Sequence, residues 1–103
     1  MKKGILGRSL SGLQLPLLHI TNHSAKGFNG YPKKNIIVTG RAHPAESSGS
    51  FMLRGFIEWL LGTSHEAAEV RDRINFFIIP MLNPDGVVLG NSRTSGAGKD
   101  LNR

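Results

Sequence analysis

Three short apolar runs, each bounded by turn residues, predict three β-strands. Asn35–Thr39 (NIIVT) and Asn75–Ile79 (NFFII) are continuously apolar, which is typical of strands buried on both faces of a sheet. Gln14–Thr21 (QLPLLHIT) is the third run. It contains Pro16, which has no backbone N–H to donate, so we expect a sheet edge here or the proline within the first residues of the strand. The glycine- and asparagine-rich stretch Asn22–Lys34 between the first two strands is predicted to be a loop.

Between the second and third strands the hydrophobic pattern changes to a helical period. Apolar residues recur on one stripe from Ser48 to Leu61, and Gly62 follows as a helix-ending residue. The capping-box pattern Thr63-x-x-Glu66 then predicts a second, shorter helix that runs to about Arg73. The residues of the first helix that we expect in the core are Met52, Leu53, Phe56, Ile57, Trp59, Leu60 and Leu61.

The order strand, strand, helices, strand predicts an α/β fold. We expect a partial mixed, mainly parallel sheet with flanking helices, because two apolar strands joined through helices are typically parallel neighbours. Residues 1–103 are enough for one domain at most. In such sheets ligands bind beyond the carboxyl ends of the strands. Two polar segments, Arg41–Glu46 and Asn83–Arg103, follow the second and third strands and are therefore the candidate site.

Composition and charge narrow the classes of function. The chain has no cysteine, which excludes disulfide scaffolds and thiolate zinc sites, fits a reducing compartment such as the cytoplasm, and leaves His, Asp and Glu as metal ligands. No apolar run approaches the roughly 18 residues of a membrane span. The net charge is +6, and residues 1–45 carry seven basic side chains and no acidic one. That half is either a solvated basic face or a surface for an anionic partner.

The segment after the second strand pairs an imidazole with a carboxylate. His43 and Glu46 stand three residues apart in the sequence His-Pro-Ala-Glu, between a strand and a helix. Both side chains are ordinary zinc ligands, and a sharp turn can direct both toward one point. The alternative is a surface turn in which Glu46 only favours the N-terminus of the following helix.

The segment after the third strand contains a tight turn and a long polar loop. Asn83-Pro84-Asp85-Gly86 has strong turn chemistry, and a simple β-turn would be enough to explain it. The loop that follows holds three glycines and the arginines Arg93 and Arg103. Long loops in compact domains are often functional, and guanidinium groups bind carboxylates in a bidentate manner, so an anion site is indicated.

Together, three motifs resemble those of the zinc metallocarboxypeptidases. They are HPAE, then NPDGVVLGNSR, and then RTSGAGKDLNR. The cytosolic branch of the family is most similar, with HPGE, NPDGV-x-x-GN-x-R and R-x-S-x-x-G-x-DLNR. The resemblance covers about residues 10–103, and Ala45 stands where that branch usually has glycine. It implies a zinc carboxypeptidase-like fold and one zinc ion in each complete catalytic domain.

Roles for individual residues follow from the resemblance. His43 and Glu46 correspond to two of the three protein ligands of the zinc. Arg93 corresponds to the arginine that polarises the scissile carbonyl, and Asn102 and Arg103 to the pair that holds the C-terminal carboxylate of the substrate. Asp85 and Asp100 are expected to order the loops. In the family the third ligand, a histidine, and the general-base glutamate follow the DLNR motif, so we expect a truncated N-terminal portion of a catalytic domain that is inactive alone.

The implied function is hydrolysis of C-terminal residues from peptides or proteins. Glutamate is one candidate residue, as in protein deglutamylation, and acidic or polyglutamylated tails such as those of tubulin are candidate substrates. We expect a cytoplasmic protein that has no membrane partner. One alternative is a catalytically inactive fragment or binding module. Another is a basic nucleic-acid-binding protein, which is disfavoured because aromatic residues do not interleave with the basic cluster in the sequence. His19, His23 and His65 are expected to be surface or packing residues.

Overall fold

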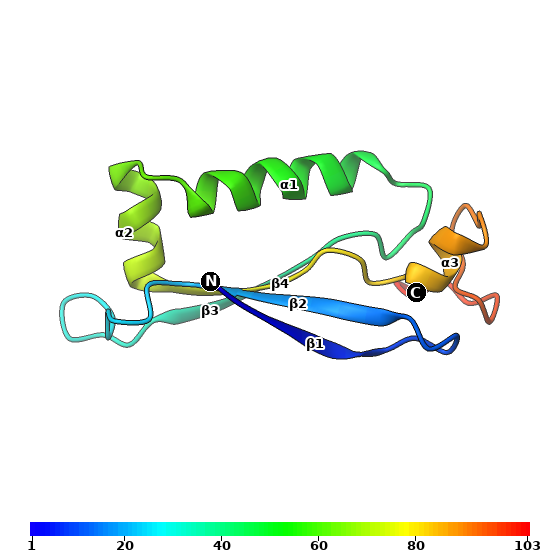
Figure 1. The fold of residues 1–103 in the computed structure, drawn as a ribbon, viewed down its shortest axis with the longest axis horizontal. Helices are drawn as coiled ribbons and strands as arrows, with labels where there is room; N and C mark the ends of the chain where they lie inside the picture. Colours follow the sequence, from blue (N-terminus) through cyan, green and yellow to red (C-terminus); the bar gives the residue numbers. More distant parts are fainter.

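The computed structural model describes residues 1–103 as a four-stranded mixed sheet with helices on one face (Figure 1). The strand order is β1-β2-β4-β3; β1 with β2 and β2 with β4 are antiparallel, and β3 with β4 is parallel. α1 runs along the sheet, α2 stands at one end of it, and α3 lies at the other end beside the chain's C-terminus. The elements are β1 (Lys2–Arg8), β2 (Gln14–Ile20), β3 (Lys34–Thr39), α1 (Ser48–Leu61), α2 (His65–Arg73), β4 (Ile74–Ile79) and α3 (Pro84–Val88).

The sheet is mixed as predicted, but the prediction that it is mainly parallel is wrong. Only β3 and β4 are parallel, because α1 and α2 form the crossover between them. The strand β1, which the sequence pattern did not predict, joins β2 through a short turn and must therefore run antiparallel to it. β1 is exposed along its whole length, so its sequence has no alternation between buried and exposed positions.

Pro16 lies in β2, which is an inner strand of the sheet, but it is the third residue of that strand and lies in a part that is paired on one side only. β4 pairs only with residues 18–20 of β2, so Pro16 has a neighbour on one side alone, namely Ile5 of β1. The register of β1 shifts between Ile5 and Gly7, directly opposite this part of β2. A proline in that position removes no hydrogen bond from the interior of the sheet.

The hydrophobic core is small and lies between α1 and the centre of the sheet. Leu53 and Leu60 of α1 pack with residues of β2 and β4, and these five side chains form the buried cluster: Ile20, Leu53, Leu60, Phe76 and Ile78. The helix boundaries of α1 match the prediction, but its core stripe was predicted too wide. Met52 is 77% exposed, and Leu61 and Trp59 are also exposed, because the sheet covers only one narrow side of the helix.

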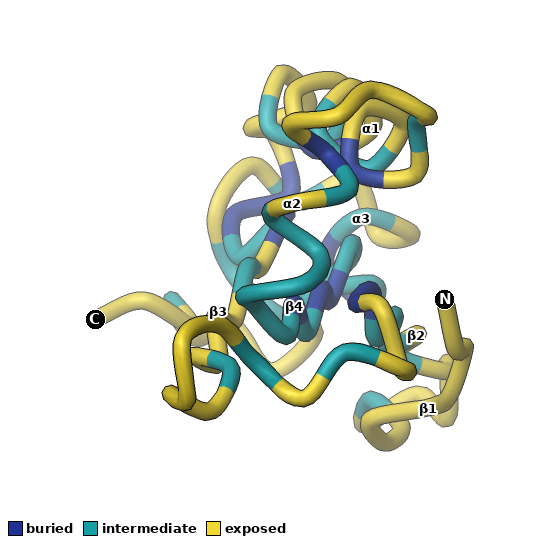
Figure 2. The backbone as a smooth tube through the Cα atoms, turned by 90° about the vertical axis from the view of Figure 1, so that its left-hand side faces the viewer, coloured by how far each residue is buried: buried dark blue, intermediate teal, exposed yellow.

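Two further predictions need correction. The capping residue of α2 is Ser64 rather than Thr63, and the Ser64 side chain accepts a hydrogen bond from the backbone N–H of Ala67. β3 is an edge strand whose outward residues are exposed, and Ile37 is 70% exposed, so this strand is not buried on both faces (Figure 2). The longest helix has 14 residues, and none of the helices combines the length and apolar character that crossing a membrane requires.

Candidate metal centre

The loop after β3 brings His43 to the carboxyl end of β4. The backbone N–H of Gly40 donates to the carbonyl of Ile79 (2.9 Å), and a Cβ atom on Gly40 would lie 2.8 Å from the carbonyl oxygen of Pro80. The two chain segments can approach this closely only because residue 40 is a glycine. Arg41 then adopts a positive φ of 56°, and its Nε donates to the carbonyl of Pro44 (2.9 Å). The loop therefore turns sharply just before His43.

The Asn83-Pro84-Asp85-Gly86 segment is the N-cap and first turn of the short helix α3 rather than a simple β-turn, and it packs against this loop. The Asn83 side chain is only 1% exposed; its Nδ2 donates to the carbonyl of Ala42 (3.1 Å), and its Oδ1 accepts from the backbone N–H of Gly86 (3.0 Å). A Cβ atom on Gly86 would lie 2.5 Å from Cγ of Pro44 and 2.5 Å from the carbonyl oxygen of Thr94. The turn and the His43 loop are thus packed into one unit.

Asp85 ties the same turn to the β1–β2 hairpin. Its buried carboxylate accepts a hydrogen bond from the Ser9 hydroxyl (2.5 Å) and another from the backbone N–H of Ser11 (3.2 Å). The hydrogen bond from Ser9 is the main cause that lowers the pKa of the Asp85 carboxyl, and the backbone bond from Ser11 adds to it. Asp85 therefore orders loops, as the sequence suggested, and does not face His43.

His43 is buried, and both of its ring nitrogens face carboxylates. Nε2 lies 2.9 Å from Oδ1 of Asp100, and Nδ1 lies 3.1 Å from Oε1 of Glu46. His43 is 6% exposed, whereas the side chain of Glu46 is 64% exposed. The structure thus brings together the two residues that the sequence proposed as metal ligands, and adds a third partner.

The contact with Asp100 determines what Nδ1 can do. The ionised Asp100 carboxylate can accept a proton from Nε2, and in that tautomer of neutral His43 the Nδ1 atom carries a lone pair. A lone pair on Nδ1 would face a carboxylate oxygen of Glu46, so a proton or a metal ion between the two atoms is needed to make this contact attractive. Two ligands of a tetrahedral zinc ion, each about 2.0–2.1 Å from the metal, lie roughly 3.3 Å apart. The observed 3.1 Å separation fits this requirement.

Asp100 holds the rest of the site in place as well. Its Oδ2 accepts from Nε of Arg93 (2.6 Å), and its Oδ1 accepts from the backbone N–H of Asn102 (2.9 Å). The Asn102 N–H, His43 and Arg93 together hold the pKa of the Asp100 carboxyl well below its usual range. A carboxylate behind a metal-binding histidine fixes its tautomer and its ring orientation. This contact with His43 is not evident from the sequence, although Asp100 is one of only two acidic residues in the segment Asn83–Arg103.

The three residues predicted to contact substrate lie in the exposed end of the loop. The side chain of Arg93 is 44% exposed, and only its Nε is hydrogen-bonded, so its two terminal nitrogens face no partner within the chain. Asn102 and Arg103 are exposed; Nη1 of Arg103 donates to the carbonyl of Asn102 (2.7 Å), while the Asn102 side-chain amide makes no hydrogen bond. Arg93 and Asn102 contact Asp100 directly.

The remaining histidines do not join the site. The ring of His19 stacks on Phe77 with a centroid distance of 4.6 Å, and His23 meets His19 edge-on at 5.1 Å. His65 is exposed at the start of α2. No group of three or more His, Cys, Asp or Glu side chains is arranged to hold a metal ion. The pair proposed from the sequence, His43 and Glu46, is therefore the candidate for binding a metal ion in this chain.

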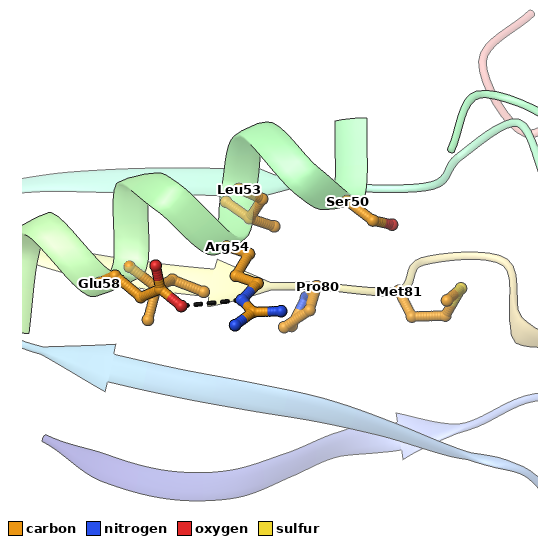
Figure 3. Close-up of a pocket in the computed structure, with 7 residues that line it drawn as sticks. Ser50, Leu53, Arg54, Glu58, Pro80 and Met81 are labelled. Carbon is orange, nitrogen blue, oxygen red and sulfur yellow. Dashed lines mark hydrogen bonds and ion pairs between the residues drawn. The ribbon is translucent and has the colours of Figure 1, made fainter. Parts of the chain in front are cut away.

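A separate hollow of about 350 Å³ lies between α1 and the end of β4 (Figure 3). Its apolar wall includes Leu53, Pro80 and Met81, and the Arg54–Glu58 ion pair (2.8 Å) lies at its rim. No side chain of the HPAE, NPDGVVLGNSR or RTSGAGKDLNR motif lines this hollow. The hollow is therefore distinct from the His43 site.

Comparison with known proteins settles the family. The family model described as zinc carboxypeptidase matches residues 1–103. The chain belongs to this family. Cytosolic carboxypeptidase 2 of Xenopus tropicalis is 49% identical over 95% of the chain, and the human protein of that name is 47% identical over 95%. Cytosolic carboxypeptidase 6 of Mus musculus is 47% identical over 95%. The predicted resemblance to the cytosolic branch is confirmed.

Solved structures agree with the family assignment. A metallo-carboxypeptidase from Burkholderia cenocepacia matches 98% of the chain with a TM-score of 0.84 and 34% identity, and the match covers 27% of that protein. A metallo-carboxypeptidase from Pseudomonas aeruginosa gives a TM-score of 0.81 at 29% identity, over 97% of this chain and 26% of that one. The chain spans only 10% of the Xenopus relative, 11% of the human one and 18% of the mouse carboxypeptidase 6.

Proposed function

We propose that the chain is the N-terminal portion of a zinc carboxypeptidase catalytic domain and supplies two of its three zinc ligands, His43 and Glu46. The observation that carries this proposal is the 3.1 Å approach of Nδ1 of His43 to Oε1 of Glu46, with Nε2 held by Asp100. The donor set is one imidazole and one carboxylate, which suits zinc. The third ligand and the general base would come from sequence outside these 103 residues.

Each residue of the site has a separate task in the proposed reaction. Zinc, when bound, would polarise the scissile carbonyl and lower the pKa of a water molecule to about 7. Arg93 would donate its free terminal N–H groups to the carbonyl oxygen of the scissile peptide as negative charge develops on it. Asp100 would keep both His43 and Arg93 in position for this, because its Oδ1 contacts His43 and its Oδ2 contacts Arg93.

Asn102 and Arg103 would hold the C-terminal carboxylate of the substrate. The guanidinium of Arg103 is exposed and can form the bidentate pair that a carboxylate prefers, and the free amide of Asn102 can donate a further hydrogen bond. This contact would select the last residue of a peptide chain. The basic first part of the chain supports acidic tails, including glutamate-rich or polyglutamylated ones such as those of tubulin, as substrates in the cytoplasm.

The test uses the complete polypeptide to which these 103 residues belong. Purified protein is stripped of metal with a chelator, reloaded with zinc, and assayed for release of the last residue from peptides that end in glutamate, lysine or leucine. We expect zinc to restore hydrolysis, His43→Ala to abolish it, and C-terminally amidated peptides to be poor substrates. Full activity of the metal-free protein, or equal cleavage of amidated peptides, would contradict the proposal.

A further inference from the structure

The loop between β2 and β3 contains a well-defined, hydrogen-bonded turn, which lies at the end of the molecule away from His43. Asn29 and Gly30 have positive φ angles of 49° and 81°, as in a type I′ turn, and Phe28 and Tyr31 exchange two backbone hydrogen bonds across it (3.0 and 2.9 Å). Paired residues of this kind present their side chains on the same face. This Phe-Asn-Gly-Tyr hairpin lies within Asn22–Lys34, for which the sequence pattern predicted only a loop.

The two aromatic side chains border a hollow of about 680 Å³ at the start of β3 and β4. The guanidinium of Arg73 lies 3.6 Å from the ring centroid of Phe28 and fixes that ring against the body of the protein. Tyr31, in contrast, is 76% exposed. Pro32 and Ile74 add apolar surface to the wall, which is therefore mainly apolar with cationic groups around it.

Two of the three cationic side chains around the hollow can interact with a ligand. Lys33 cannot, since its ammonium group already donates to Thr21 Oγ1, to the carbonyl of Asn22 and to the carbonyl of Arg71. Lys34 is exposed and makes no hydrogen bond or ion pair. Arg73 pairs with Glu69 through Nη2 and its Nε is buried, so its Nη1 is the nitrogen that remains free for a ligand.

We propose that this hollow binds an acidic peptide segment that carries an apolar or aromatic side chain. The apolar side chain would enter the hollow beside Tyr31, and a carboxylate would pair with Lys34 and Arg73 at the rim. Nucleic acid fits less well, since its affinity depends on neutralising several phosphates, and only two cations and one free aromatic face are on offer. Aromatic and basic side chains therefore lie side by side at this hollow, although they do not interleave in the sequence. Their small number suits a peptide segment better than a nucleic acid.

This site is separate from the proposed catalytic one. The hairpin and α2 lie at one end of the molecule, and α3 and the C-terminal loop lie at the other (Figure 1), along a long axis of 47 Å. The peptide would therefore be held at a point remote from the scissile bond. Binding at the hollow requires neither zinc nor a free C-terminus, so its test is independent of hydrolysis.

The experiment measures the binding of a fluorescent peptide to the complete polypeptide. The probe is a short glutamate-rich peptide with one central phenylalanine, amidated at its C-terminus so that Arg103 has no terminal carboxylate to hold. Fluorescence anisotropy should give a dissociation constant on the order of 100 µM or below. Lys34→Glu should weaken binding about tenfold. Tyr31→Ala should weaken it about fivefold, and Tyr31→Phe should bind like the wild type.

Lys3→Glu is the matched control, because Lys3 is an exposed lysine on β1, at the opposite edge of the sheet. This variant changes the net charge by the same amount and should leave peptide binding unchanged. Three outcomes would overturn the proposal: no binding of the peptide at millimolar protein, equal loss in Lys3→Glu and Lys34→Glu, or tighter binding of an oligothymidylate than of the peptide. Circular dichroism confirms that each variant keeps the wild-type fold.

Discussion

The metal-centre end and the α1 flank of this chain are stabilised by opposite means. At the metal-centre end the buried side chains are polar, and His43, Asn83 and Asp85 are all at most 6% exposed. Each of them has hydrogen-bond partners within the chain. At the α1 flank, which comprises α1 and the sheet that it covers, the buried side chains are apolar, but the cluster has only five members. Large apolar residues also remain exposed there, such as Met52 of α1 and Ile37 of the edge strand β3.

The difference shows which part of the molecule the 103 residues specify fully. A buried polar group without a partner costs about 1–3 kcal/mol, so the paired network around Asn83 permits very few alternative arrangements. An apolar face has no such directional demand, and β3 also offers a free edge. The chain therefore fixes the geometry of its loops more completely than it covers its sheet.

The largest expected effect concerns the catalytic activity of the isolated chain, whose metal-centre end is ordered but incomplete. We expect the isolated 103-residue chain to release no C-terminal residue from any peptide, because two ligands hold zinc weakly and the chain offers no third ligand. The measurement is mass spectrometry of peptides incubated with rigorously purified chain and zinc. Reproducible release that survives a change of expression host would show that the polar end is sufficient alone.

The next effect divides the roles of the two arginines in the complete polypeptide. Arg93→Ala should lower kcat by about 10²–10³ with little change in KM, because its free N–H groups meet charge that develops in the transition state. Arg103→Ala should mainly raise KM, and Arg103→Lys should rescue it only in part, since an ammonium lacks the planar fork.

Zinc content provides the control for these variants. It should stay near the wild-type value in all three, because neither arginine is a ligand. If kcat and KM change in parallel in both alanine variants, and zinc content or melting temperature falls with them, the arginines only fold the glycine-rich loop.

A smaller effect tests how tightly the polar end is packed. Gly86→Ala should lower the free energy of unfolding of the complete polypeptide by about 3 kcal/mol, because the new Cβ would meet Pro44 and the backbone of Thr94 at 2.5 Å. Gly4→Ala on β1 is the matched control, since nothing lies within 4 Å of that position, and it should change stability by less than about 0.5 kcal/mol. Equal melting temperatures for the two variants would mean that the turn is loosely packed.

The smallest effect concerns the uncovered flank. We expect the isolated chain to aggregate or to form a molten state, because β3 exposes Ile37 beside an unpaired edge. Ile37→Thr should raise the soluble fraction of the isolated chain by a factor of about two, and it keeps the β-branched shape that suits a strand. Analytical centrifugation and thermal unfolding check this. A sharp cooperative transition from a soluble wild-type monomer would contradict it.

Much of the fold follows from local patterns in the sequence. The boundaries of α1 and the positions of β2, β3 and β4 could be predicted, because periodicity and turn residues act over a few positions. β1 could not, since a fully exposed strand carries no hydrophobic period. The direction of β2 could not be predicted either. Its antiparallel pairing depends on the hairpin that joins it to β1 and on its position beside β4, and neither is a local property of the sequence.

The sequence indicated that His43 and Glu46 lie close together, but it did not indicate the contacts that hold His43 in place. His43 and Glu46 were found because ligand types at short spacing leave a pattern, and they lie together in the structure. The support from Asp100 was missed, because 57 residues separate it from His43 and only the fold makes them neighbours. Trp59 was predicted to lie in the core but is exposed. A helical stripe predicts which face of a helix is apolar, but it does not predict how much of that face the sheet covers.

The central claim is that Asp100 prepares His43 to bind zinc through Nδ1, and zinc affinity tests it most directly. The measurement is competition with a chelating indicator, using the complete polypeptide and its Asp100→Asn, His43→Ala and Asp85→Asn variants. We expect Asp100→Asn to weaken zinc binding about 10–100-fold. His43→Ala should weaken it further, and Asp85→Asn, whose carboxylate contacts Ser9 rather than His43, should keep wild-type affinity. Unchanged zinc affinity in Asp100→Asn, or an equal loss in Asp85→Asn, would contradict the account.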